Sequence, residues 1–394
     1  MIRPLPDPSL PLPDADARAH SAKVVERVRE AIARNGGWLP FADYMQIALY
    51  EPGLGYYASG TRKFGTGGDF VTAPELTPRF GRSLAVQVDA IRKRTAGDVL
   101  ELGAGTGRLA TDLLNHLDAR DGTWRYLILE PSPELRERQR AMLAQRAPAH
   151  ASRVAWIDTL PPSIDGVVVM NEVLDALPVH VVARRSQQWY ERGVVAGAQL
   201  ALDERPLASV ALRRLAQIRF PATIDYASEI NPAAAALVGD LSRRLARGAL
   251  LVIDYGFPRH EYYHPQRSSG TLVAHYRHRV HSDPLLWPGL CDLTAHVDFT
   301  AMADEGVRAG LDIAGFATQA AFLLGCGIVD ALRDAGPPES AAYVKEASAV
   351  QTLLSPAEMG ELFKVLALTR GDGIEWPGFA LRNMRHRLGG GDPV

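Results

Sequence analysis

Short apolar runs alternate with helix-length amphipathic runs along the middle of the chain. The apolar runs predict strands at residues 98–102, 126–129, 154–157, 167–170 and 250–254. Apolar positions at helical spacing predict helices at residues 109–117, 133–145 and 233–245. Strands that alternate with helices are typical of a parallel sheet with helices on both faces. The sequence therefore predicts a doubly wound, mostly parallel, Rossmann-like α/β fold.

The segment before this alternation predicts a helical extension. Apolar residues at helical spacing predict a helix over residues 21–34, with Ser21 as its N-cap. Residues 51–80 are glycine-rich and loop-like, but their interleaved aromatic residues indicate a packed, functional loop. A further helix is predicted over residues 80–93.

Later segments interrupt the alternation. Two β-rich runs within residues 179–196 predict an inserted hairpin, and residues 256–300 predict a long polar loop. Residues 316–323 and 363–369 predict a C-terminal strand pair. These patterns predict a flexible lead-in at residues 1–18 and a helical and loop extension at 19–96. One large domain follows at residues 97–385, with insertions at about 179–245 and 256–350, and residues 386–394 are a flexible tail.

Charge and cysteine content narrow the class of function. Lys+Arg 43 against Asp+Glu 45 gives a net charge of −2, so no positive field attracts nucleic acid or an anionic membrane. The two cysteines, Cys291 and Cys326, make neither a disulfide framework nor a zinc site. The N-terminus lacks signal-peptide features, and the apolar runs are too short to cross a bilayer. We therefore expect a cytoplasmic protein without membrane insertion.

A glycine-rich turn, residues 101–107, follows the first predicted strand and precedes a helix. Glycines in this context let the backbone turn tightly and approach a ligand. Arg108 stands where the nicotinamide fingerprint needs glycine, and the Lys-Ser/Thr pair of a phosphate-binding loop is absent. The turn favours a nucleoside cofactor without phosphates, S-adenosylmethionine, over a tight turn without a ligand. Its predicted binding residues are Glu101, Gly103, Gly105 and Gly107.

Acids at the ends of the next two strands extend this cofactor site. Glu130 follows the turn at the distance where an acid accepts hydrogen bonds from ribose hydroxyls. Asp158 ends the third strand and is a candidate for the adenine amino group, or simply a surface acid. Because ligands lie beyond the carboxyl ends of parallel strands, we expect these acids to converge with Asn171.

The fourth strand ends in the polar segment 171–178. Methyl transfer requires a nucleophile in line with the sulfonium methyl. For an arginine substrate, carboxylates can hold the guanidinium and accept its proton. The predicted catalytic residues are therefore Glu172, Asp175 and Asn171. The alternative is that Asp175 caps the following turn and Glu172 is solvated.

Polar residues after the fifth strand are candidates for substrate binding. They are Asp254, Tyr255, His296 and Asp298. They either line a substrate channel or tie the long loop to the sheet. His296 and Asp298 lack a third partner at a recognisable ligand spacing, so no metal site is predicted.

These motifs together resemble the MidA-like S-adenosylmethionine-dependent methyltransferases, a family that includes the mitochondrial complex I assembly-factor arginine methyltransferase. The resemblance covers roughly residues 20–385 and follows seven motifs in order, at residues 67–75, 101–107, 171–180, 254–256, 270–272, 292–299 and 355–360. It implies a class I S-adenosylmethionine methyltransferase fold with an N-terminal helical extension. Val173-Leu174 departs from the aromatic residues common at this place in the family.

The resemblance also implies roles for residues and partners. The cofactor would be held by Gly103, Gly105, Gly107 and Glu130. The loop with Asp69 and Thr72 would close over the cofactor, and residues 171–175 would face its methyl group. The implied reaction is symmetric dimethylation of an arginine in a respiratory NADH:quinone oxidoreductase subunit. A homodimer is left open.

Other functions fit the same sequence. One is a small-molecule methyltransferase, and another is an S-adenosylmethionine-binding assembly chaperone with little turnover. The acids at the predicted transfer position favour an enzyme over the chaperone. A dehydrogenase is disfavoured because Arg108 and the glycine spacing oppose a nicotinamide cofactor.

Overall fold

The computed structural model describes residues 10–59, 72–117, 124–222 and 224–389. It divides into two compact units, each assembled from three stretches of chain. Unit 1 contains residues 1–71, 175–234 and 259–296, and unit 2 contains residues 72–174, 235–258 and 297–394. Residues 72–96 and 297–350 belong to unit 2.

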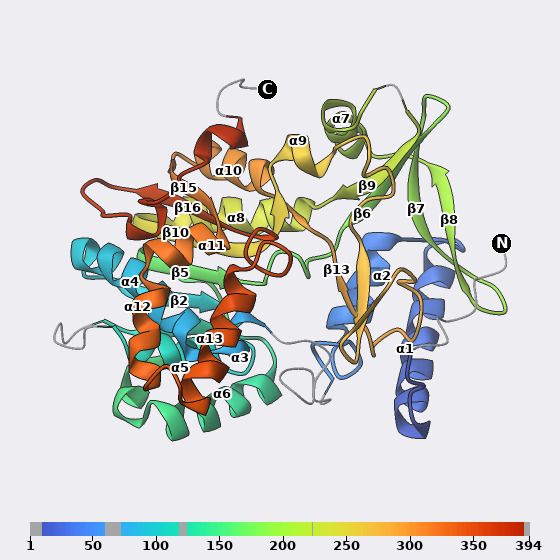
Figure 1. Cartoon of the computed structure of the whole chain (residues 1–394). Coiled ribbons are helices and arrows are strands. Elements are labelled where there is room, and N and C mark those ends of the chain that lie inside the picture. Colours follow the sequence, from blue (N-terminus) through green and yellow to red (C-terminus); the bar gives the residue numbers. More distant parts are fainter. Residues whose placement is uncertain (1–9, 60–71, 118–123, 223, 390–394) are drawn as a thin grey trace. The chain divides into compact units, whose positions relative to one another are not determined.

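Unit 2 is built on the predicted α/β sheet (Figure 1). Its strands lie in the order β15-β16-β10-β5-β2-β3-β4, with β14 paired to β10. Pairing is parallel from β4 to β10, and β16 is antiparallel to both neighbours. The strands are β2 (Asp98–Leu102), β3 (Tyr126–Leu129), β4 (Val154–Ile157), β5 (Ile164–Asn171), β10 (Leu245–Phe257), β14 (Val297–Asp298), β15 (Asp312–Thr318) and β16 (Phe363–Arg370). The doubly wound, mostly parallel sheet is confirmed.

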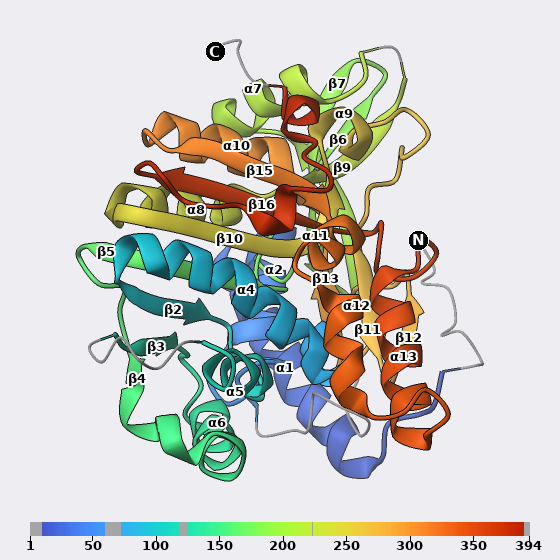
Figure 2. The same cartoon turned by 60° about the vertical axis from the view of Figure 1, so that its left-hand side comes forward.

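Helices cover both faces of this sheet (Figure 2). They are α3 (Ala73–Leu76), α4 (Pro78–Thr95), α5 (Arg108–Leu114), α6 (Pro133–Arg146), most of α8 (Pro232–Arg244), α10 (Phe299–Arg308), α11 (Gln319–Gly325), α12 (Ile328–Ala331) and α13 (Ala341–Leu354). Ala317 of β15 belongs to the core cluster shared with α4, α5 and α11. Its neighbour Phe316 packs on Phe299 of α10, with ring centroids 5.4 Å apart. Successive side chains of a strand point to opposite faces, so α10 covers the other face.

The predicted C-terminal strand over residues 316–323 is wrong in its second half. β15 ends at Thr318, whose hydroxyl accepts a hydrogen bond from the Ala321 backbone N–H at 3.3 Å and caps α11. The apolar run continues across this cap, so hydrophobicity alone did not mark the change from strand to helix.

Unit 1 combines helices with two antiparallel sheets (Figure 1). One sheet contains β1 (Leu39–Pro40), β6 (His180–Arg185), β7 (Gln188–Ala196), β8 (Leu200–Pro206) and β9 (Tyr226–Ile230), and the other contains β11 (Val273–Tyr276), β12 (Arg279–His281) and β13 (Asp292–Thr294). The helices are α1 (Ala15–Arg34), α2 (Phe41–Tyr50), α7 (Val210–Arg219) and α9 (Arg259–Tyr262). The predicted hairpin is confirmed as β6 and β7, which turn through Ser186 and Gln187.

Two predictions for unit 1 are wrong. Its first helix begins at Ala15 instead of Ser21, because the Asp14 carboxylate accepts a hydrogen bond from the Ala17 backbone N–H at 2.8 Å. Residues 256–300 do not form a plain loop, since they contain α9 and the three-stranded sheet. Strands of three or four residues are too short to give a clear alternating pattern. Within the described ranges, no helix is both long and apolar enough to cross a membrane.

A row of glycines brings neighbouring strands of unit 2 close together. Gly166 of β5 pairs with Asp98 of β2 and with Gly248 of β10. A Cβ atom at Gly248 would lie 1.8 Å from the Gly166 carbonyl oxygen, and the φ angle of Gly248 is +119°. A larger residue there would separate β5 from β10 and displace their carboxyl ends.

We expect Gly248→Ala to lower the free energy of unfolding by about 3–5 kcal/mol, because the new methyl group collides with rigid backbone. Gly371→Ala is the matched control, since its φ is +105° but its Cβ would meet only Arg247 Cγ at 3.5 Å. Gly371→Ala should lower the free energy of unfolding by about 1 kcal/mol. Urea unfolding measures both, and equal losses would contradict the proposed collision.

Candidate active site

The glycine-rich turn joins β2 to α5 with a left-handed backbone at each glycine. The φ angles of Gly103, Gly105 and Gly107 are 66°, 53° and 83°. A Cβ atom at Gly107 would lie 3.1 Å from the Gln139 Cα of α6, so the turn packs directly on that helix. Gly103 is exposed, which leaves its backbone open to a ligand. The turn thus has the conformation expected of a loop that approaches a ligand through its backbone.

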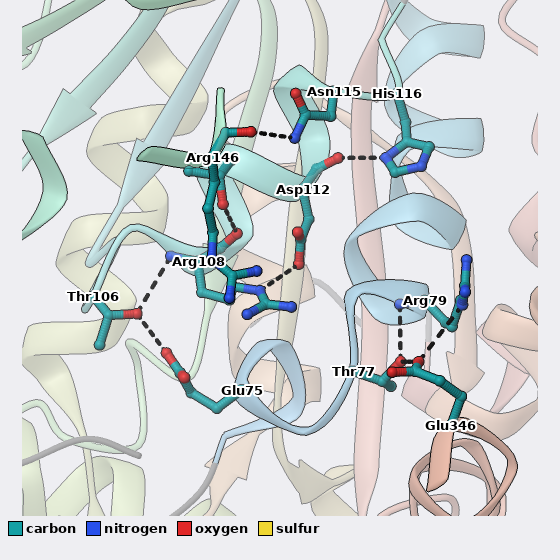
Figure 3. Close-up of polar contacts among 11 residues, drawn as sticks. Glu75, Thr77, Arg79, Thr106, Arg108, Asp112, Asn115, His116, Arg146 and Glu346 are labelled. Atoms are coloured by element: carbon teal, nitrogen blue, oxygen red, sulfur yellow. Dashed lines mark hydrogen bonds and ion pairs between the residues drawn. The ribbon is translucent and has the colours of Figure 1, made fainter. Parts of the chain in front are cut away.

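A short helix before the sheet contacts this turn. The Thr106 hydroxyl donates a hydrogen bond to the Glu75 carboxylate of α3 and accepts one from the Arg108 backbone N–H at 3.3 Å (Figure 3). Thr72 precedes α3, and its carbonyl accepts a hydrogen bond from the Glu75 N–H at 3.0 Å. Asp69 lies outside the described residues. Glu75 was not predicted as a site residue, and here it ties the predicted loop segment to the glycine turn.

Glu101 lies one residue before the end of β2 and is buried, with 2% of its surface exposed. Its Oε2 accepts a hydrogen bond from the Tyr126 hydroxyl at 2.7 Å. Burial raises the pKa of Glu101 to about 7, the Tyr126 hydrogen bond opposes this rise, and the charge of Glu130 adds to it. Glu101 can therefore change its charge near neutral pH at the edge of the cofactor turn.

Glu130 lies just beyond β3 and is also buried. Its Oε1 accepts a hydrogen bond from the Ser132 backbone N–H at 2.9 Å, and its Oε2 accepts one from the Gln139 side-chain amide at 3.2 Å. Both of these donors are neutral. Each carboxylate oxygen can accept more than one hydrogen bond, so these two contacts are compatible with hydrogen bonds from ribose hydroxyls.

Asp158, beyond β4, has an exposed side chain. Its Oδ1 forms an ion pair with Arg136 at 2.7 Å. Arg136 also donates to the backbone carbonyls of Glu130 and Ile157, at 2.5 and 3.0 Å. Arg136 therefore links the ends of β3 and β4. The predicted role of Asp158 toward adenine stays a prediction.

Asp254 organises the segment that follows β5. Its Oδ2 accepts hydrogen bonds from the backbone N–H groups of Val173 and Leu174, at 3.2 and 2.9 Å, and its Oδ1 accepts from Tyr255 N–H at 2.9 Å. The side chain is fully buried. Asp254 was predicted to bind substrate, and these three bonds give it a positioning role.

Glu172 is held in an uncommon backbone conformation beside this clamp. Its φ angle is +54°, in the left-handed region that non-glycine residues seldom adopt. Its N–H donates to the Ile253 carbonyl at 2.9 Å, and its Oε1 accepts from the Asn171 amide at 3.1 Å. The Asn171 Oδ1 is buried and has no hydrogen-bond partner among the described residues. A strained acid beside an unsatisfied amide oxygen is typical of a functional site.

The remaining predicted residues divide between the two units. In unit 2, the Tyr255 ring packs on Phe363 with centroids 3.9 Å apart, and the Asp298 Oδ1 accepts from Ala301 N–H at 3.1 Å as the N-cap of α10. Asp175 and His296 belong to unit 1. The Asp175 carbonyl accepts from Ala295 N–H at 2.9 Å, and the His296 N–H donates to the Thr271 hydroxyl at 3.0 Å. Their predicted catalytic and substrate roles stay predictions.

The sequence interpretation missed Gln139, which bonds to both Glu130 and the Gly105 carbonyl. A signal for it was present. Leu135, Gln139 and Leu143 follow one another at four-residue spacing and are the buried residues of α6. A polar residue on an otherwise apolar helical stripe needs a buried hydrogen-bond partner.

Comparison with known proteins agrees with this geometry. Residues 80–317 match a family described as S-adenosyl-L-methionine-dependent methyltransferases. The human mitochondrial protein arginine methyltransferase NDUFAF7 is 30% identical, covering 85% of this chain and 81% of its own length. Its Drosophila melanogaster homologue is 27% identical, covering 93% and 90%. A crystal structure of a Burkholderia thailandensis protein bound to S-adenosyl-homocysteine is 47% identical, with a TM-score of 0.91, covering 96% of this chain and all of its own.

The site therefore takes S-adenosylmethionine, and the described residues fit it. Three left-handed glycines form the turn, and the buried Glu130 carboxylate lies just beyond the neighbouring strand. The turn is followed by no Lys-Ser/Thr pair for a phosphate chain. Gly103, Gly105 and Glu130 are the residues that would hold the cofactor.

The raised pKa of Glu101 predicts a specific pH dependence of stability. Its pKa rises from the ordinary 4.5 to about 7 on folding, so the folded state binds the proton more tightly. The contribution of Glu101 to the free energy of unfolding is then fully present below pH 4.5 and is lost as the pH rises to about 7. Relative to Glu101→Gln, the wild type should lose about 3 kcal/mol across this window. Chemical unfolding at several pH values measures it. Glu137→Gln, which removes an exposed carboxylate, should follow the wild type, and a Glu101→Gln curve parallel to wild type would contradict the assignment.

Asp254→Asn should disrupt the segment after β5, because an N–H₂ group would replace an oxygen that accepts backbone amides. We expect a loss of about 2 kcal/mol in the free energy of unfolding. Methyl transfer should fall at least tenfold while the calorimetric affinity for S-adenosylhomocysteine changes less than threefold. Asp312→Asn, an exposed acid on β15, should alter none of these quantities. A proportional loss of affinity and transfer would argue against a positioning role.

Proposed function

The chain belongs to the family of S-adenosyl-L-methionine-dependent methyltransferases, and from this premise we propose that it methylates arginine in a protein substrate. The observation that carries the proposal is the Asn171–Glu172 pair at the carboxyl end of β5, with Glu172 held in a left-handed conformation. This is the strand next to β2, which leads into the cofactor turn.

The relatives support the choice of acceptor. Proteins named protein arginine methyltransferase are 27–30% identical to this chain over most of both lengths. The motif resemblance further suggests a subunit of a respiratory NADH:quinone oxidoreductase as the substrate protein. We therefore propose that the substrate is such a subunit and that the protein acts in the cytoplasm.

The proposed chemistry assigns a task to each residue. Bound S-adenosylmethionine supplies an electrophilic methyl group on a positively charged sulfur. A guanidinium nitrogen must lose a proton as it forms its bond to carbon, and the carbon–sulfur bond breaks with its electrons going to sulfur. Glu172 would hold the guanidinium through charge-assisted hydrogen bonds and accept the proton. Asn171 would orient Glu172 through the 3.1 Å hydrogen bond from its amide.

The test uses methyl-labelled S-adenosylmethionine and a lysate from a strain that lacks this protein. We expect label on an arginine of one respiratory subunit, identified by mass spectrometry. Glu172→Gln should lower the rate by about 10²–10⁴, the usual contribution of acid–base catalysis, with S-adenosylhomocysteine binding retained. Glu339→Gln, an exposed acid, should behave as wild type.

Other outcomes would replace the proposal. Label only on small metabolites would make the chain a small-molecule methyltransferase. Cofactor binding without transfer, together with normal assembly of the respiratory complex in the Glu172→Gln strain, would support an assembly chaperone instead.

A further inference from the structure

Gln139 is a fully buried amide in the middle of α6, on the stripe otherwise formed by Leu135 and Leu143. An apolar residue would fit such a stripe without needing hydrogen bonds. A buried amide without partners is costly, so its presence needs an explanation from its contacts.

Three hydrogen bonds join Gln139 to three different elements. Its Nε2 donates to the Gly105 carbonyl at 3.0 Å and to the Glu130 Oε2 at 3.2 Å. Its Oε1 accepts from the indole N–H of Trp156, on β4, at 2.8 Å. The two N–H groups and one oxygen lone pair of the amide are thus in use. The same residue also fills the space beside Gly107, where a Cβ would come within 3.1 Å of its Cα.

The indole of Trp156 fixes the orientation of the Gln139 side-chain amide. Trp156 Nε1 is a donor only, so the oxygen of Gln139 must face it and the nitrogen must face Glu130 and Gly105. Arg140 lies over the Trp156 ring, 4.8 Å from its centroid, and helps to keep the ring in place. The orientation of the amide is therefore a property of the surrounding structure.

We infer that Gln139 is a positioning residue for recognition of the cofactor ribose. It holds the Glu130 carboxylate through a neutral donor and so sets the position of the oxygens that would accept the ribose hydroxyls. The same amide fixes the Gly105 carbonyl, which couples the glycine turn to that acceptor. The ligand class is an adenosine with an intact ribose diol, and the inference holds whatever the methyl acceptor is.

The test compares S-adenosylhomocysteine with its 2′-deoxy analogue by calorimetry on the full chain. Wild type should prefer the parent ligand clearly. Gln139→Leu should weaken the parent ligand about tenfold, weaken the analogue much less, and so remove most of the ribose preference. Gln145→Leu, an exposed glutamine of the same helix, should bind both ligands as wild type does.

Trp156→Phe provides a second, milder variant should Gln139→Leu fail to fold. It removes the indole donor that orients the amide while leaving both amide donors present, and it should reduce the preference at least threefold. An unchanged preference in either folded variant would overturn the inference. An equal loss for the parent ligand and the analogue would also overturn it, because that pattern indicates general disruption of α6.

Discussion

Carboxylates buried at the carboxyl edge of a parallel sheet need hydrogen-bond donors, and in unit 2 neutral donors contact three of them. Glu101 accepts from a tyrosine hydroxyl, Glu130 from a backbone amide and a glutamine, and Asp254 from three backbone amides. A nearby arginine would stabilise such an acid more strongly but would cancel its charge. The geometry of the glycine turn and of the strand ends depends on these hydrogen bonds.

That choice of donors suits a reaction between two cations. The sulfonium of S-adenosylmethionine carries positive charge, and a guanidinium acceptor carries another until it is deprotonated. Acids that stay charged would reduce the repulsion between the two. Burial raises the pKa of Glu101 to about 7, so the charge of this acid depends on pH. Arg136 donates to the main-chain carbonyls of Glu130 and Ile157 and to the exposed Asp158 carboxylate.

Much of this arrangement could be predicted from the sequence, and the exceptions have physical reasons. β2, β3 and β4 have the predicted bounds because each is an isolated apolar run between breakers. The positions of Glu101, Glu130 and Asn171 at strand ends follow from the same pattern. The strands of residues 273–294 escaped prediction because each has only three or four residues, too few for a clear alternating pattern. The hydrogen bonds of Asp254 and of Gln139 were not predicted either. A sequence shows which side chains are polar, but it does not show which groups will lie within hydrogen-bonding distance after folding.

The interleaving of the two units along the chain has a consequence for dissecting this protein. The backbone passes between them five times, after Val71, Leu174, Ala234, Pro258 and His296. No single cut yields two fragments that each hold one complete unit. A fragment ending before residue 297 would lack β15 and β16, and one starting after residue 71 would lack α1 and α2. Gene fusions, split reporters and domain swaps must therefore treat the whole chain as their smallest exchangeable part.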